Sequence, residues 1–153
     1  MNLRLKSLET SAEAEELVDV LVTATHETLN TLDDTTEREE AERAARAWLG
    51  RFGEPGARAI VGEDEGRTLA LAATAPFTDP LTADVVPMLV VLWVDPTIRH
   101  RGVARALVAE LRRLLGAQGF GVLAARASTN DDALLSMGER WGLVRSWEFL
   151  SSE

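Results

Sequence analysis

The spacing of apolar residues in the second half of the chain predicts a strand followed by a helix. Met88 to Val94 is an uninterrupted apolar run of strand length. Asp95 and Pro96 end this run, because proline cannot donate a hydrogen bond to a neighbouring strand. From Val103 to Gly116 the apolar residues recur at the period of a helix, so we expect an amphipathic helix here.

The first half of the chain predicts two helices and a hairpin. Thr10 and Glu13 have the spacing of a capping box, which opens a helix that ends near Thr25. A loop rich in Thr and Asp follows, and a second helix is expected over Glu37 to Leu49. Three strands are expected at Leu3–Leu5, Ala57–Val61 and Thr68–Ala75, of which the last two form the hairpin.

The remaining segments complete an α/β pattern. Pro76 to Pro87 is expected to be a loop. After the amphipathic helix, the pattern predicts a strand at Gly121–Ala127, a short helix at Asp131–Arg140 and a final strand at Leu143–Leu150. This alternation predicts one domain over residues 1–153, with a mixed sheet of about six strands flanked by about four helices.

The turn between the central strand and its helix has the composition of a phosphate site. Gly102 and Ala104 have little or no side chain, so an anion can approach the unpaired N–H groups of the first helical turn. The helix macrodipole adds partial positive charge there, and Arg99 and Arg101 add full charges. A second glycine-rich stretch, Gly116 to Gly121, follows a helix instead of preceding one, so we interpret it as a helix end and a turn.

This turn resembles the signature of the GCN5-related N-acetyltransferase (GNAT) family. The family has Arg/Gln-x-x-Gly-x-Gly/Ala between a strand and a helix, and Arg99-x-x-Gly102-x-Ala104 fits that pattern. The strand ends in Val94-x-Pro96, which the family also favours. A second conserved block of the family is similar to Asn130, Ala133 and Trp141-Gly142-Leu143.

The resemblance implies an enzyme that transfers acetyl from acetyl-CoA to a primary amine by direct attack. It places coenzyme A in a cleft between two splayed strands, here Met88–Val94 and Gly121–Ala127. The N–H of Val94 would then polarise the thioester carbonyl as an oxyanion donor. The cofactor-binding residues that it implies are Trp93, Val94, Arg99, His100, Arg101, Gly102, Val103, Ala104, Arg105 and Asn130.

Proton transfer is where the chain departs from the family pattern. The family often uses a tyrosine to protonate the departing thiolate, but this chain has no tyrosine, and the expected position falls at Met137 or Gly138. Ser136 and Ser128 are the nearest hydroxyls, with helix-surface or capping roles as the alternative. Asp84 is the candidate base, with a solvated loop residue as the alternative. A thiol has a pKa of ~8.5, so the thiolate can leave near neutral pH without a general acid. An amine has a pKa of ~10.4 and is mostly protonated there, so it must lose a proton before it attacks. The general base is therefore more important than the general acid.

Composition and charge exclude several classes of function. A net charge of −9 argues against nucleic-acid binding, and the absence of cysteine excludes disulfides and thiol nucleophiles. No apolar run approaches the ~20 residues of a membrane span, so we expect a cytoplasmic protein. His26 and His100 have no third ligand beside them in the sequence, so no metal site is expected.

The acidic residues suggest the charge of the acceptor. By the resemblance, the acceptor side is bordered by Glu27, Asp33, Asp34, Glu37, Glu39, Glu40, Asp79 and Asp84. Their field would attract a small cationic amine. The alternative is a solvated helix face, stabilised by Glu39–Arg43 and Glu42–Arg46 pairs.

Two further hypotheses concern activity and assembly. The missing tyrosine leaves open a catalytically silent domain of the same fold, which would bind coenzyme A as a sensor or interaction module. The short final strand leaves a sheet edge that a second copy of the chain could cover, so a homodimer is also expected.

Overall fold

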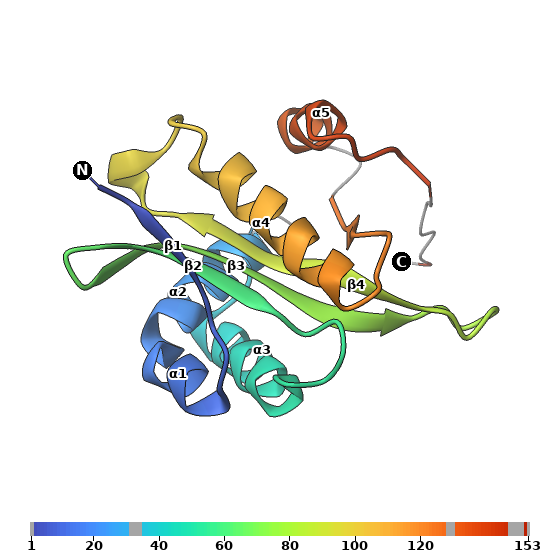
Figure 1. The fold of residues 1–153 in the computed structure, drawn as a ribbon, viewed down its shortest axis with the longest axis horizontal. Helices are drawn as coiled ribbons and strands as arrows, with labels where there is room; N and C mark the ends of the chain where they lie inside the picture. The colour runs from blue at the N-terminus through green and yellow to red at the C-terminus, as the bar shows by residue number, and fades with distance from the viewer. Residues whose placement is uncertain (1, 31–34, 128–130, 147–151, 153) are drawn as a thin grey trace.

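The strands of the central sheet follow one another in chain order (Figure 1). The computed structural model describes residues 2–30, 35–127, 131–146 and 152. Within this part of the chain the sheet consists of β1 (Arg4–Ser7), β2 (Ala59–Asp64), β3 (Arg67–Thr78), β4 (Val85–Val94) and β5 (Ala124–Ala125). The first four strands pair antiparallel, and β5 pairs parallel to β4.

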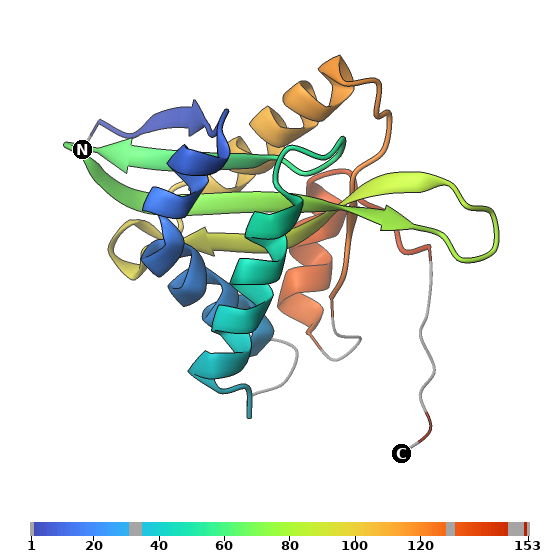
Figure 2. The same ribbon diagram turned by 90° about the horizontal axis from the view of Figure 1, so that it is seen from below.

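Helices cover both faces of this sheet (Figure 2). One face carries α1 (Ser11–Glu16), α2 (Val18–Asn30) and α3 (Arg38–Arg51), and the other carries α4 (Val103–Ala117). Because side chains alternate along a strand, each strand contributes to two cores. Val91 and Trp93 of β4 pack towards α1–α3, whereas Leu92 and Val94 pack towards α4. The α/β fold predicted from the sequence is confirmed.

A fifth helix, α5 (Asp132–Arg140), lies beside α4 and is loosely attached to it (Figure 1). It has no fully buried residue. At its C-terminal end, the carbonyl of Trp141 accepts a hydrogen bond from Arg112 Nη1 of α4 at 2.9 Å.

The loop expected from Pro76 to Pro87 is shorter and covers only residues 79–84, because both prolines lie inside strands and face each other in the β3–β4 ladder. The pairing of β2 with β3 ends at Ala73, and that of β5 with β4 begins at Met88. Beyond these limits β3 and β4 each have a neighbouring strand on one side only among the described residues. A proline is tolerated there because its nitrogen can face the unpaired side.

Three other boundaries differ from the prediction. The first helix is interrupted at Leu17, and its second part continues to Asn30. The strand expected over Gly121–Ala127 is reduced to two residues, Ala124 and Ala125. Residues 143–146 of the expected last strand form no strand, and residues 147–150 lie outside the described part.

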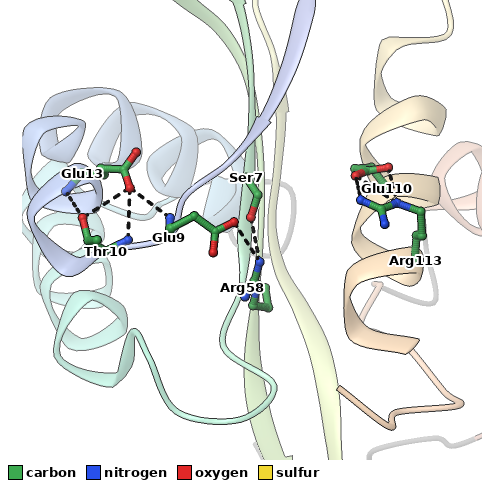
Figure 3. A network of polar contacts seen from close by, with 7 residues as sticks. All are labelled: Ser7, Glu9, Thr10, Glu13, Arg58, Glu110 and Arg113. Carbon is green, nitrogen blue, oxygen red and sulfur yellow. Dashed lines mark hydrogen bonds and ion pairs between the residues drawn. The ribbon is translucent and has the colours of Figure 1, made fainter. Parts of the chain in front are cut away.

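The capping box predicted at Thr10 is confirmed (Figure 3). The N–H of Glu13 donates to Thr10 Oγ1 at 3.2 Å, and the N–H of Thr10 donates to Glu13 Oε1 at 3.2 Å. The backbone N–H of Glu9 and the ammonium of Lys6 also bind this carboxylate. Together they hold the pKa of Glu13 below its ordinary value of 4.5. Because the folded state lowers this pKa, the stabilisation is complete above pH 4.5 and is lost as the pH falls through the lowered pKa.

We expect Glu13→Gln to lower the free energy of unfolding at neutral pH, because the amide cannot accept charge-assisted hydrogen bonds. The difference from the wild type should shrink in acid as Glu13 itself becomes protonated. Urea unfolding between about pH 7 and about pH 3 measures it. The control is Glu16→Gln, an exposed residue of the same helix without these hydrogen bonds. A difference that persists undiminished in acid would contradict the role of the charge.

Candidate active site

The edge of β4 that faces β5 is paired over only part of its length. β5 pairs with β4 at Met88 and Leu89. At the next position, Val90 forms a bulge, since Leu89 pairs with Thr74 and Val91 with Ala73. Arg126 and Ala127 continue the chain after β5 without strand structure. Among the described residues, the edge of β4 from Val90 to Val94 therefore has no strand beside it.

The backbone of Val94 points to this open edge. The N–H of Asp95 donates to the carbonyl of Leu69 in β3 at 2.8 Å. Successive residues of a strand direct their backbone groups to opposite sides, so Val94 directs its N–H and carbonyl away from β3. The carbonyl accepts a hydrogen bond from Arg99 Nε at 2.8 Å. The N–H of Val94 is thus turned to the side where the sequence predicted the thioester.

The turn after β4 is held by Asp95. Asp95 Oδ1 accepts hydrogen bonds from the Thr97 hydroxyl at 2.6 Å and from the Thr97 N–H at 2.9 Å. These two bonds lower the pKa of Asp95, so its carboxylate stays ionised. The next residues form a short 3-10 helix, Pro96–Ile98, whose Ile98 is buried against α4. This arrangement fixes where the basic segment starts.

The first turn of α4 presents unpaired N–H groups. The first hydrogen bond of the helix runs from the N–H of Ala106 to the carbonyl of Gly102, so the N–H groups of residues 103–105 have no partner within the helix. Gly102 caps the helix with φ 78° and offers no side-chain acceptor. A Cβ at Gly102 would meet nothing within 4 Å. These features fit the pyrophosphate of coenzyme A, which would accept hydrogen bonds from these N–H groups.

The arginines of the turn have different environments. Arg101 and Arg105 are exposed and form no ion pair with any other residue in the described ranges. Arg99 instead donates to the Val94 carbonyl and, through Nη2, to Glu27 of α2 at 2.9 Å. Among the arginines of this turn, Arg101 and Arg105 are therefore the ones whose charge is not already matched by a carboxylate.

The other residues predicted to bind the cofactor contribute in different ways. His100 is exposed and has φ 64°, and Val103 is buried, so only its backbone faces the turn. The side chain of Trp93 lies on the α2 side of the sheet, opposite to α4, with 8% of its surface exposed. Ala104 lies in the first turn of α4. Asn130 lies outside the described residues.

Of the candidate acid and base residues, Asp84 lies away from Val94. Asp84 lies in the connection between β3 and β4, at the opposite end of β4, about 30 Å along the strand. It is exposed, and its N–H donates to Thr82 Oγ1 at 3.2 Å, which favours the solvated loop residue. Ser136 is exposed on α5, and Ser128 lies outside the described residues.

The histidines have no ligand-binding geometry. Nε2 of His26 donates to the carbonyl of Thr36 at 2.9 Å, which ties α2 to the segment before α3. In the described ranges, no group of three or more His, Asp or Glu side chains lies close enough to hold a metal ion. Within the same residues no helix is long and apolar enough to cross a membrane.

Glu27 is the site residue whose role the sequence did not indicate. It was expected only as one member of an acidic group. In the structure it is the ion-pair partner of Arg99, which follows it by 72 residues in the chain. Neither residue lies in a pattern that joins it to the other, so no signal in one sequence could have paired them.

Comparison with known proteins decides which family this arrangement belongs to. The model of the acetyltransferase (GNAT) family matches residues 22–142, which include β4, the basic turn and α4. The chain belongs to the acetyltransferase (GNAT) family. It is therefore an N-acetyltransferase whose acyl donor is acetyl-CoA, as the sequence predicted. No curated protein matches the chain.

Solved structures share the fold of this acetyltransferase at low sequence identity. Aminoglycoside N-acetyltransferase AAC(6')-Iy in complex with coenzyme A is 14% identical with a TM-score of 0.72, over 99% of this chain and 94% of that one. A predicted acetyltransferase with acetyl-CoA from Clostridium acetobutylicum is 16% identical with a TM-score of 0.71, over 99% and 96%. A ribosomal-protein-alanine N-acetyltransferase from Brucella melitensis biovar Abortus 2308 is 16% identical with a TM-score of 0.69, over 99% of each chain.

We expect Gly102→Glu to weaken coenzyme A binding by about a hundredfold, or about 2.7 kcal/mol, measured by calorimetry. The new side chain would bring negative charge to the space in front of the uncapped N–H groups. Gly102→Gln is the control, because glutamine has the size of glutamate without its charge. Arg101→Ala should weaken binding modestly, and less at high salt. Equal affinities for the glutamate variant and the wild type would refute the pyrophosphate site.

Proposed function

We propose that this acetyltransferase acetylates a primary amine of a small cationic acceptor by direct attack. The observation that carries the proposal is the N–H of Val94, which is turned to the open edge of β4 beside the uncapped start of α4. When bound, acetyl-CoA supplies an acetyl thioester at this edge. The chain supplies a backbone donor for the charge that develops on the thioester oxygen, and no side chain need move.

The distribution of charge supports a cationic acceptor. Arg101 and Arg105 lie at the start of α4, on one face of the sheet. The helices of the other face carry Glu27 in α2 and Glu39 and Glu40 in α3. Glu39 and Glu40 form no ion pair with another described residue, although α3 also carries Arg38 and Arg43. The excess of negative charge on this face comes from α1 and α2, which carry five carboxylates and no Lys or Arg. Opposite fields at the two faces would guide an anionic donor and a cationic acceptor to different sides.

Part of the acidic group does not contribute to this field. Glu42 is paired with Arg46 at 3.3 Å, as a solvated helix face predicts. Asp79 accepts hydrogen bonds from the N–H groups of Leu81 and Thr82 at the tip of the β3–β4 hairpin, near Asp84. The proposal therefore rests on the acidic residues of α1, α2 and α3.

Similarity of fold does not indicate which type of acceptor the enzyme uses. Relatives of this fold include an aminoglycoside acetyltransferase and an acetyltransferase of a ribosomal protein. The charge distribution supports a cationic acceptor, and we propose a small one. We further propose that the chain folds as a single domain, acts in the cytoplasm and forms a homodimer.

We expect spermidine and glucosamine to be acetylated with a higher kcat/KM than glycine or glutamate. For the cations, kcat/KM should fall as salt rises from about 0.01 to about 0.15 M, because the screening length shrinks from about 30 to about 8 Å. Thiol release from acetyl-CoA measures both effects.

Two matched double variants distinguish the local field of the α3 carboxylates from the effect of the protein's net negative charge. Glu39→Gln with Glu40→Gln should reduce the salt dependence, whereas Asp79→Asn with Asp84→Asn at the hairpin tip should not. A preference for zwitterionic acceptors without salt dependence would contradict the cationic acceptor. Coenzyme A binding without turnover of any amine would favour the catalytically silent module.

A further inference from the structure

Arg99 joins two parts of the molecule that serve different substrates. Its backbone belongs to the turn before α4, where the pyrophosphate is expected. Its guanidinium bonds the carbonyl of Val94 through Nε at 2.8 Å and the carboxylate of Glu27 through Nη2 at 2.9 Å. Glu27 belongs to α2, on the opposite face of the sheet from α4. The ion pair therefore bridges the donor side and the acceptor side at the open edge of β4.

The pair is placed where solvent and ligands can reach it. The side chains of Arg99 and Glu27 are 43% and 44% exposed. Their ion pair is consequently weak and can be exchanged at little cost. Arg99 also has more donors than the pair uses, because a guanidinium carries five N–H groups in a planar fork. It can keep its bond to Val94 while its outer N–H groups change partner.

A phosphate is a strong competitor for those outer groups. Arginine binds phosphate oxygens through two parallel charge-assisted hydrogen bonds, whereas Glu27 accepts only one hydrogen bond from Arg99. Glu27 would be the group displaced, because no other carboxylate in the described residues contacts Arg99. The Glu27 carboxylate would then have no cationic partner, and it would lie near Val94, because both now bind the same Arg99 guanidinium.

We propose that Arg99 exchanges Glu27 for the coenzyme A pyrophosphate, and that the released Glu27 carboxylate binds the ammonium group of the acceptor. The inference rests on the proposed function, since it assumes a cationic acceptor. It makes Glu27 a specificity-determining residue that is masked in the absence of the donor. Donor and acceptor binding are then positively coupled, and the coupling acts equally in both directions.

The test is Glu27→Gln, with calorimetry of coenzyme A and steady-state kinetics with spermidine at about 0.15 M salt. Without the competing carboxylate, coenzyme A should bind about two- to fivefold more tightly. The KM for spermidine should rise by about tenfold, because a charge-assisted bond is lost. A variant damaged in folding would weaken both ligands, so these opposite changes distinguish the exchange from damage.

Asp19→Asn is the matched control, since it removes the same charge from an exposed position of α2 that does not contact Arg99. Both of its values should stay within about twofold of the wild type at this salt concentration. Calorimetry of spermidine with and without coenzyme A should show tighter binding in its presence for the wild type and no coupling for Glu27→Gln.

Each contrary outcome would overturn one part of the proposed exchange. Unchanged or weaker coenzyme A binding by Glu27→Gln would overturn the exchange at Arg99. Tighter coenzyme A binding with an unchanged KM for spermidine would overturn Glu27 as the acceptor's carboxylate. If the wild type acetylates no cationic amine, the proposed function fails instead. The calorimetry of coenzyme A still decides the exchange, because it needs no acceptor.

Discussion

The unpaired edge of β4 is the constraint on which the site depends. A strand has backbone donors and acceptors on two edges, and unpaired groups must find another partner. β3 pairs β4 from Val85 to Val94, but β5 pairs it only at Met88 and Leu89. The bulge at Val90 lies where this second pairing ends. The rest of the edge can bind an extended ligand as a further strand would bind, with main-chain hydrogen bonds.

The same edge brings together the three parts of the site. β4 supplies the backbone, the turn after Val94 supplies the basic segment, and α4 supplies uncapped N–H groups. Arg99 fastens the turn to the carbonyl of Val94 and reaches Glu27 of α2. In the proposed mechanism, catalysis depends on oriented backbone dipoles more than on acidic or basic side chains. This agrees with a chain that has no tyrosine and whose β4 has no carboxylate.

Local patterns were sufficient to predict much of this architecture. The apolar run before Asp95 and the periodic helix from Val103 each reflect interactions within a short segment, and both are found in the structure. The extent of pairing depends on distant strands. For that reason Pro76 and Pro87 were wrongly assigned to a loop, and the strand over Gly121–Ala127 was predicted too long.

In the candidate site, too, the features formed within a short segment could be predicted, whereas contacts between distant segments could not. The turn with Gly102 could be predicted, because its glycine and the helix start are adjacent in sequence. The partner of Arg99 could not, since the contact with Glu27 exists only after α2 has packed on β4. Asp84 was proposed from its position before the strand, but that strand begins at Val85 and carries it away from Val94.

We expect coenzyme A to lie along the open edge of β4 and against the first turn of α4. Backbone amide NMR during a titration with coenzyme A tests it most directly, because it reports each N–H separately. We expect large changes in the amide signals of Val94, Val103, Ala104 and Arg105, with little change along α3. Changes confined to other segments, with the signals of Val94 and residues 103–105 unmoved, would contradict it.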